Sequence, residues 1–529
     1  MLSRAVTLDV PDDAPRHRFM RYVRPPADKN STRGAGSLFP LRPHTRKLRV
    51  AVDVNTLGEP TPELMRVLAR DEEVEPLLLV QNDELEPERW MQALGCPQWY
   101  QFTFTTVADA PRFMDSSTVG VSGYEDGMRT LATSGHFFSV YAMLDEAARA
   151  AYTDDAGITL ADRHRAAALA SAAGAIGADA IVAAAPTVGR DDVADNDLVV
   201  SVTPSQLIPL FGHYLRVTGN SVLTTTKGQV VGGGSFVQTL NATSVADLYL
   251  AGINASAPHL NAIQLMATMG GDHSLVRSME AIALRLGRAA RAVDHLLAVL
   301  SNGTSTDMQR ADTSETAAEA FDRVLLYLCA AMDRYARVTR TLFDTALDPE
   351  NQRCSLTSTD ELRSIIGKLE PTETAHLESL GSYAWVIGKL RNRIHALPLD
   401  TRHQLSRGYG SSTTVAIALD GLSEFDPATT PLNQDQFDKL GVWKAQSSNP
   451  FHPRAYTADI ATLATTLFRE TVRYLDDFSH FIIRNKPLAT ITTTKHPVLG
   501  CWADDPRPMP DVLPNELLYR EMLGWADFG

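Results

Sequence analysis

Cysteine is scarce in this chain, with four residues among 529. They are Cys96, Cys329, Cys354 and Cys501. They form no CxxC pair and show no Cys/His ligand spacing. This pattern argues against a disulfide framework and against a zinc site, and it fits a reducing compartment. We therefore expect a cytoplasmic protein.

Long apolar runs are also lacking. The most membrane-like segment, residues 166–186, is mostly alanine and is interrupted by Asp179, so it is too polar for a membrane span. The first residues, MLSRAVTLDVPDDAPRHR, contain no apolar stretch of the kind that a secretory signal requires. We expect neither a membrane anchor nor a membrane partner.

Positive charge is in deficit. The chain has 49 Lys and Arg against 63 Asp and Glu, a net charge of -14. A protein that coats nucleic acid without sequence preference would be basic overall, so the balance argues against that class. Basic residues do cluster in residues 16–49 and 389–407. A basic groove restricted to such a cluster stays compatible with the composition.

The length and the 44% hydrophobic content indicate a globular protein of two to four domains with a large core. Residues 1–47 are rich in Pro, Arg, Ser and Gly without any period and are expected to form a flexible arm. We predict an α/β domain over residues 48–235 and a mainly α-helical domain over residues 236–490. A Pro-rich C-terminal tail over residues 491–529 follows.

The α/β prediction rests on alternating strand and helix patterns. Residues 48–55 and 74–83 are apolar, β-branched runs that predict strands, and a helix pattern after Pro62 lies between them. Strand, helix and strand in this order predict a parallel sheet. Further strands are predicted at residues 178–186 and 198–202. Residues 85–135 show no clear period and are expected to be irregular.

The helical prediction rests on the 3.6-residue period. Residues 274–300 and 315–343 carry apolar side chains at i, i+3, i+4 and i+7. Further helices are expected from about residue 373 and over residues 458–485, with a strand-like insert at residues 413–427.

Two helix starts are also predicted from capping residues. Thr203 followed by Pro204 predicts one, because Thr is a favoured N-cap and Pro a favoured first helical residue. Asp272 predicts another as an N-cap.

The segment KLRNRIHALPL is the strongest candidate for chemistry. Arg391 and His395 are four residues apart and therefore share one face of a helix, with polar Asn392 beside Arg391. When the two are held together, the cation can stabilise the negative charge of a phosphate and the imidazole can accept the proton of a 2′-hydroxyl. The structural alternative is a helix end with surface charges, stopped ahead of Pro398.

The N-terminal half resembles the PIN-like nucleases, a Rossmann-like α/β family whose carboxylates hold divalent metal. The motif AVDVNTL matches a first strand ending in D-x-N and supplies Asp53; a later helix and a GAD-strand supply Asp162 and Asp179. The resemblance implies a site for Mg²⁺ or Mn²⁺ made by these three carboxylates at the carboxyl edge of the sheet. The family's later T-x-D acid is replaced here by Ala184-Ala185-Pro186. An inactive domain used for binding or assembly is therefore the alternative.

The C-terminal half resembles the HEPN superfamily of helical ribonuclease and RNA-binding domains. KLRNRIH is similar to its R-x(4–6)-H signature, with three intervening residues in place of four to six. The resemblance implies that Arg391 binds the scissile phosphate, that His395 is the general base or acid, and that Asn392 fills the polar position. It also implies a homodimer or larger homo-oligomer, with His395 at a dimer interface or cleft, and no required cofactor.

Three hypotheses of function follow. The first is an RNA-targeting stress or phage-defence protein, bacterial by its alanine- and arginine-rich composition, that cleaves RNA without metal through Arg391 and His395. The second is a non-catalytic RNA- or protein-binding assembly or sensor protein. The third is a metal-dependent nuclease that uses Asp53, Asp162 and Asp179.

Overall fold

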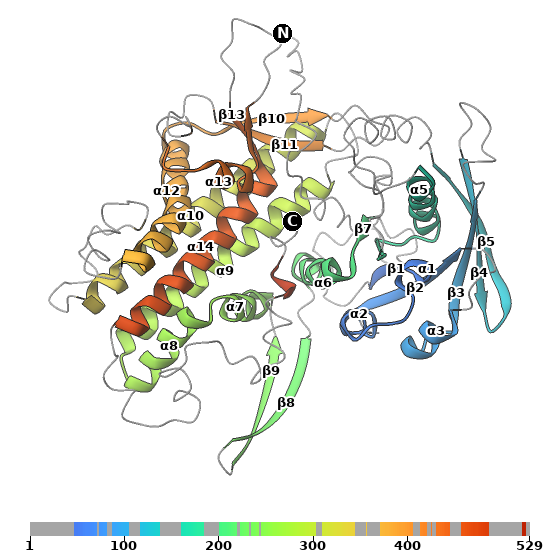
Figure 1. The fold of residues 1–529 in the computed structure, drawn as a ribbon, viewed down its shortest axis with the longest axis horizontal. Coiled ribbons are helices and arrows are strands. Elements are labelled where there is room, and N and C mark those ends of the chain that lie inside the picture. Colours follow the sequence, from blue (N-terminus) through green and yellow to red (C-terminus); the bar gives the residue numbers. More distant parts are fainter. Residues whose placement is uncertain are drawn as a thin grey trace, which may run out of the picture.

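The structure is a computed structural model, and it combines a strand-rich part with a group of long helices (Figure 1). The described residues are 47–70, 73–81, 87–104, 117–137, 160–184, 200–219, 223–231, 234–242, 245–302, 309–343, 356, 371–405, 413–419, 425, 430–444, 456–485 and 521–524. Among them, no helix is long and apolar enough to cross a membrane.

The N-terminal part is built on a mixed sheet of seven strands in the order β5-β4-β3-β2-β1-β6-β7. The strands are β1 (Leu48–Asp53), β2 (Val74–Gln81), β3 (Gln98–Phe104), β4 (Ser117–Glu125), β5 (Met128–Phe137), β6 (Ala180–Val182) and β7 (Val200–Val202). The pairs among β3, β2, β1, β6 and β7 are parallel, whereas β4 pairs antiparallel with β3 and with β5. The predicted α/β sheet is confirmed, but it is not purely parallel.

The antiparallel strands correct the prediction for residues 85–135, which are not irregular throughout. This region contains helix α3 (Glu88–Leu94) and strands β3 and β4. β4 and β5 are joined by Asp126 and Gly127, both with positive φ, of 49° and 77°. An Asp-Gly pair at such angles makes the tight hairpin turn that suits the strand twist. β4 itself is rich in Ser, Thr and Gly, and so it lacks a clear apolar alternation.

Helices cover both faces of the sheet, because successive side chains of a strand point to opposite faces. On one face, Ala51 of β1 packs in a cluster with α5 (Leu160–Ala175). On the other, Val50 and Val52 pack in a larger cluster with α2 (Pro62–Leu68) and α6 (Pro204–Thr218). The predicted start of α6 is confirmed, with Pro204 in its first turn and the Gln206 side chain accepting from the Thr203 N–H at 3.0 Å.

The C-terminal part is a bundle of long helices. They are α7 (Val245–Ser256), α8 (Pro258–Gly270), α9 (His273–Asn302), α10 (Gln309–Phe343), α12 (Pro371–Ala396) and α14 (Ile460–Asn485). The predicted helices in this region are confirmed. Asp272 caps α9, because its Oδ1 accepts the N–H groups of Ser274 and Leu275 at 3.1 and 3.0 Å.

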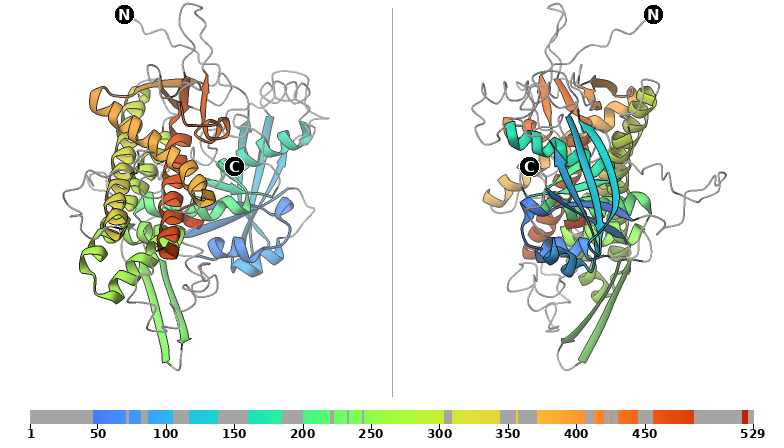
Figure 2. Two further views of the ribbon diagram at one scale, coloured as in Figure 1. Left: turned by 60° about the vertical axis from the view of Figure 1, so that its left-hand side comes forward. Right: turned by 90° about the vertical axis from the view of Figure 1, so that its right-hand side faces the viewer.

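Smaller elements complete the C-terminal part. A four-stranded antiparallel sheet contains β10 (Asp400–Leu405), β11 (Thr413–Ala418), β13 (Tyr456–Asp459) and β12 (Val442–Lys444), with helix α13 (Gln434–Lys439) nearby. The hairpin β8 (Leu223–Val231) and β9 (Gly234–Ala242) projects away from the helices (Figure 2). The domain boundary predicted between residues 235 and 236 falls inside β9.

The two parts are joined by a buried polar cluster around Asp294 of α9. Its carboxylate meets His213 Nδ1 at 2.7 Å and Arg216 Nε at 2.5 Å, both on α6, and accepts from the Tyr249 hydroxyl of α7 at 2.7 Å. Arg216 also donates to the carbonyl oxygen of Met522 at 2.6 Å. The carboxylate of Asp294 thus connects α6, α7 and α9, and Arg216 links this cluster to the C-terminal segment 521–524. The hydrophobic core around it is also continuous from the sheet to the bundle.

Candidate functional site

Asp53 is placed where β1 ends, at the carboxyl edge of the sheet. Its side chain is fully buried, and both of its oxygens accept from Arg165 of α5, each at 2.8 Å. The Thr56 hydroxyl donates a further hydrogen bond to Oδ2 at 2.8 Å. A bidentate guanidinium is a strong partner for a carboxylate. The negative charge of Asp53 is therefore balanced within the protein.

Arg165 is itself positioned by neighbouring strands. Its Nε donates to the Gln81 side chain at 2.6 Å, and its guanidinium lies 5.9 Å from the ring centroid of Phe102. Asn55, the second polar residue of the D-x-N motif, accepts from the Gln81 backbone N–H at 2.8 Å. Asp53 and Asn55 of the D-x-N motif therefore take part in a hydrogen-bond network. In this network the Arg165 guanidinium binds the Asp53 oxygens that a metal ion was expected to bind.

Asp179 lies at the opposite edge of the sheet. Its Oδ2 accepts from the backbone N–H of Arg49 at 2.9 Å, next to the parallel pairing of Val50 with Ala180. Arg49 and Asp53 are four strand residues apart, which is roughly 13 Å. The prediction that Asp53 and Asp179 converge is wrong. The physical reason is that Asp179 precedes its strand whereas Asp53 ends one, and parallel strands place such positions at opposite edges.

The third predicted carboxylate, Asp162, belongs to α5, but its side chain lies outside the described residues. Within the part of the chain that is described, no group of three or more His, Cys, Asp or Glu side chains could hold a metal ion. A Mg²⁺ or Mn²⁺ ligand set is thus not assembled from Asp53 and Asp179.

The Arg391 and His395 pair lies in the last two turns of α12, which ends at Ala396 ahead of Pro398. Arg391 is half-buried and donates to the Asn392 side chain at 3.1 Å, and His395 is exposed. Arg391 also lies near Cys329 of α10. Burial raises the pKa of that thiol to about 11, with Asp333 acting in the same direction and the charge of Arg391 opposing it. His395 is therefore accessible from solvent, beside a cation held against α10.

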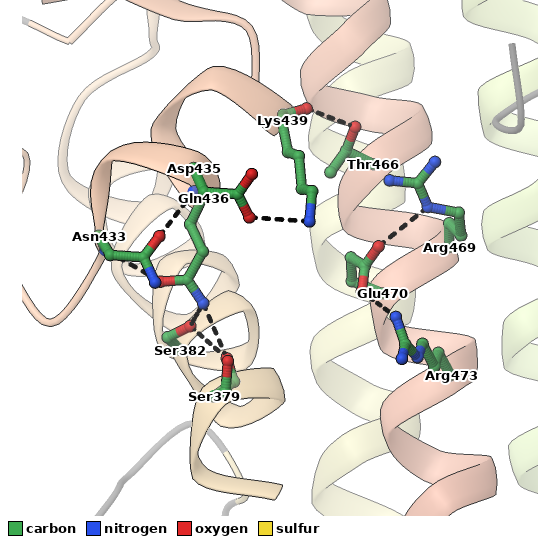
Figure 3. Close-up of polar contacts among 10 residues, drawn as sticks. All are labelled: Ser379, Ser382, Asn433, Asp435, Gln436, Lys439, Thr466, Arg469, Glu470 and Arg473. Carbon is green, nitrogen blue, oxygen red and sulfur yellow. Dashed lines mark hydrogen bonds and ion pairs between the residues drawn. The ribbon is translucent and has the colours of Figure 1, made fainter. Parts of the chain in front are cut away.

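α12 is hydrogen-bonded to α13, and α13 is in turn hydrogen-bonded to α14, because the Thr466 hydroxyl donates to the carbonyl oxygen of Lys439 at 2.8 Å (Figure 3). Gln436 of α13 donates to the carbonyl oxygen of Ser379 at 3.0 Å and to the Ser382 hydroxyl at 2.7 Å. Across from them on α14, Glu470 accepts from Arg469 at 2.9 Å. Tyr383 of α12 faces the same group, and burial, followed by the charge of Glu470, raises its pKa to about 12. These contacts position the helix that carries Arg391 and His395.

A group of arginines on α9 and α10 was not singled out from the sequence. Arg285, Arg288, Arg334 and Arg337, hereafter the arginine cluster, influence one another electrostatically. The signal that could have revealed them is the repeated spacing R-x-x-R on both helices. Such spacing places two cations on the same side of a helix.

Comparison with known proteins adds no further constraint. No protein-family model, no curated protein and no solved structure matches this chain.

Proposed function

We propose that this protein is an RNA-targeting ribonuclease of HEPN type that acts without metal, in stress response or phage defence. The observation that carries the proposal is the exposed imidazole of His395, one helical turn from the half-buried guanidinium of Arg391. A proton-transfer group needs access to substrate, and a phosphate-binding cation gains strength where solvent is partly excluded.

The proposed reaction is an intramolecular displacement in RNA. His395 takes the proton of a 2′-hydroxyl, whose oxygen attacks the adjacent phosphorus. The bond to the 5′-oxygen breaks, and that oxygen receives a proton from an imidazolium. The products are a 2′,3′-cyclic phosphate and a free 5′-hydroxyl. Arg391 stabilises the charge that develops on the phosphate oxygens, while Asn392 holds the Arg391 guanidinium. A second copy of the chain would supply the second imidazole, in line with the expected homodimer.

The strand-rich part is proposed to be a PIN-like domain that no longer cleaves. This proposal is supported by the Arg165 guanidinium, which donates a hydrogen bond to each of the two Asp53 carboxylate oxygens. This observation favours a second candidate function, a non-catalytic RNA- or protein-binding assembly or sensor protein. Metal-dependent cleavage would require the Asp53–Arg165 pair to open.

The test is cleavage of a labelled single-stranded RNA by the full chain. Activity should persist in EDTA, and an otherwise identical strand with 2′-deoxyribose at every position should not be cut. His395→Ala should lower the rate by about 10²–10⁴-fold, and Arg391→Ala by on the order of 10²-fold. Arg393→Ala, which removes the same charge from the same helix, is the matched control and should cleave at the normal rate.

The alternatives give different outcomes. Cleavage that persists in the Arg391→Ala, His395→Ala double variant, with normal folding, would exclude this pair. Activity that EDTA abolishes would point to the carboxylates of the strand-rich part. RNA binding without cleavage under any condition would favour the non-catalytic candidate.

A further inference from the structure

The arginine cluster comes from two helices, α9 and α10, that pack along each other (Figure 1). Arg285 and Arg288 lie near the middle of α9, and Arg334 and Arg337 lie in the second half of α10. Arg334 Nη2 donates to the Ser278 hydroxyl of α9 at 2.8 Å, which links the two helices. The charges of Arg334, Arg288 and Arg337 therefore act on Arg285 across the packed helices.

Arg285 lies among several other cationic side chains. Burial lowers the pKa of Arg285, and the neighbouring charges of Arg334, Arg288 and Arg337 lower it further. The carboxylate of Asp333 acts in the opposite direction. Like charges brought this close destabilise the folded chain unless an opposite charge joins them.

Hydrogen bonding in the cluster is also incomplete. Within the described part of the chain, Arg285 Nη1 and Arg337 Nε are closed to solvent and have no hydrogen-bond partner. A buried donor without a partner is costly, and more so when it is charged. Both residues are only partly buried, so a ligand from solution can reach their side chains.

We propose that the arginine cluster binds a phosphate group. A phosphate offers several anionic oxygens, and the planar fork of a guanidinium matches two of them at once. The proposal does not depend on cleavage by Arg391 and His395, since it concerns other residues. The phosphate group belongs either to an RNA backbone or to a free nucleotide, and both present the same oxygens.

Arg391 and the arginine cluster both adjoin α10. Cys329, which senses the charge of Arg391, and Arg337 are eight residues apart on α10. That separation is about 12 Å along the helix axis. A bound strand would thus have its backbone held at the cluster while a neighbouring nucleotide lies near α12.

The experiment measures binding to the full chain carrying His395→Ala, so that cleavage does not interfere. The probes are inorganic phosphate, ATP and a fluorescent single-stranded RNA of twelve nucleotides. Arg285→Gln and Arg337→Gln should each weaken binding of at least one probe by about 10-fold or more. Arg323→Gln, which removes an exposed arginine from α10, is the matched control and should bind normally.

A thermal shift separates a binding role from a structural one. Without ligand, Arg285→Gln should melt at the same or a higher temperature, because repulsion within the cluster is relieved. The saturating probe should raise the melting temperature of the His395→Ala chain and of the control by more than it raises that of Arg285→Gln. Binding of RNA alone identifies a backbone site, and binding of ATP or phosphate alone identifies a free-nucleotide or anion site. Failure of all three probes, or normal binding by both cluster variants, would overturn the proposal.

Discussion

At the scale of single residues, the partner of a charged group decides what the group can do. Asp53 is a buried carboxylate whose two oxygens face Arg165, and the Arg165 side chain is 22% exposed. Arg165 is 112 residues away in the sequence. A strand-end aspartate was predictable from the D-x-N motif, but its arginine partner was not, because nothing local in the sequence links α5 to the end of β1.

The first prediction concerns this pair. Arg165→Gln should lower the free energy of unfolding by about 3–5 kcal/mol, because it leaves the Asp53 carboxylate buried without its counter-charge. Urea unfolding followed by circular dichroism measures the change. Adding Asp53→Asn to the same chain should recover part of the loss. Arg89→Gln breaks an exposed pair with Glu59 and should change stability by less than about 1 kcal/mol. Equal effects of Arg165→Gln and Arg89→Gln would contradict the assignment.

The second prediction concerns thiol reactivity. Since the pKa of Cys329 is raised to about 11, only roughly one thiol in a thousand is ionised at pH 8. The thiolate is the reactive form, so alkylation of folded protein should label Cys96, which is partly exposed, and spare Cys329. Mass spectrometry of peptides after iodoacetamide treatment measures the extent of alkylation at each cysteine. In urea, both Cys96 and Cys329 should react. Rapid labelling of Cys329 in the folded chain would refute its burial.

At the scale of elements, a helix or strand could be predicted where its apolar residues recur at a clear helical or strand spacing. α9, α10 and α14 were predicted because their apolar residues recur at helical spacing and face a common core. β4 and β5 were missed because the Ser, Thr and Gly of β4 hide the two-residue alternation. The Asp126-Gly127 pair was the available signal for their hairpin. The exposed end of α12 was predictable from Pro398, whereas the arginine cluster depends on how α9 and α10 pack.

The third prediction concerns a close approach to α6. A Cβ atom at Gly212 would lie 2.3 Å from the carbonyl oxygen of Met522, so Gly212→Ala should displace segment 521–524 and destabilise the protein. Gly287 in α9 is the matched control, since its Cβ would meet no atom nearer than 3.7 Å. Gly287→Ala should be neutral or stabilising by up to about 1 kcal/mol, as expected for alanine in a helix. Thermal melting compares the two variants, and equal stability would contradict the contact.

At the scale of the whole molecule, the Asp294 cluster makes one unit of the strand-rich part and the bundle. Burial alone would raise the pKa of Asp294, but the charge of Arg216 and the hydrogen bond from His213 outweigh it and hold the pKa well below the ordinary range. The carboxylate therefore stays ionised in the folded protein at any pH where the chain is handled. This junction was not predictable from sequence, because His213, Arg216 and Asp294 each fit an ordinary helix pattern.

The fourth prediction follows from the sign of that shift. A depressed carboxyl pKa contributes stability that is fully present above the unfolded pKa, about 4, and is lost as the pH falls from there toward the folded pKa. Asp294→Asn should therefore cost about 3–5 kcal/mol near pH 7, and the difference from the unsubstituted chain should shrink below about pH 4. Urea unfolding at several pH values measures both. A difference that stays constant down to pH 3 would contradict an ionised Asp294.

The continuous core has a consequence for how binding can be observed. Residues of β1 and of α9 belong to one buried cluster, so the strands and the helices should melt in a single cooperative transition. A ligand that binds only the folded bundle then stabilises the strands by the same free energy, through linkage. Hydrogen exchange of the β1 amides, far from the arginines, would thus slow when phosphate binds to α9 and α10. Slower exchange in the sheet would therefore reveal a ligand that binds only to the helices.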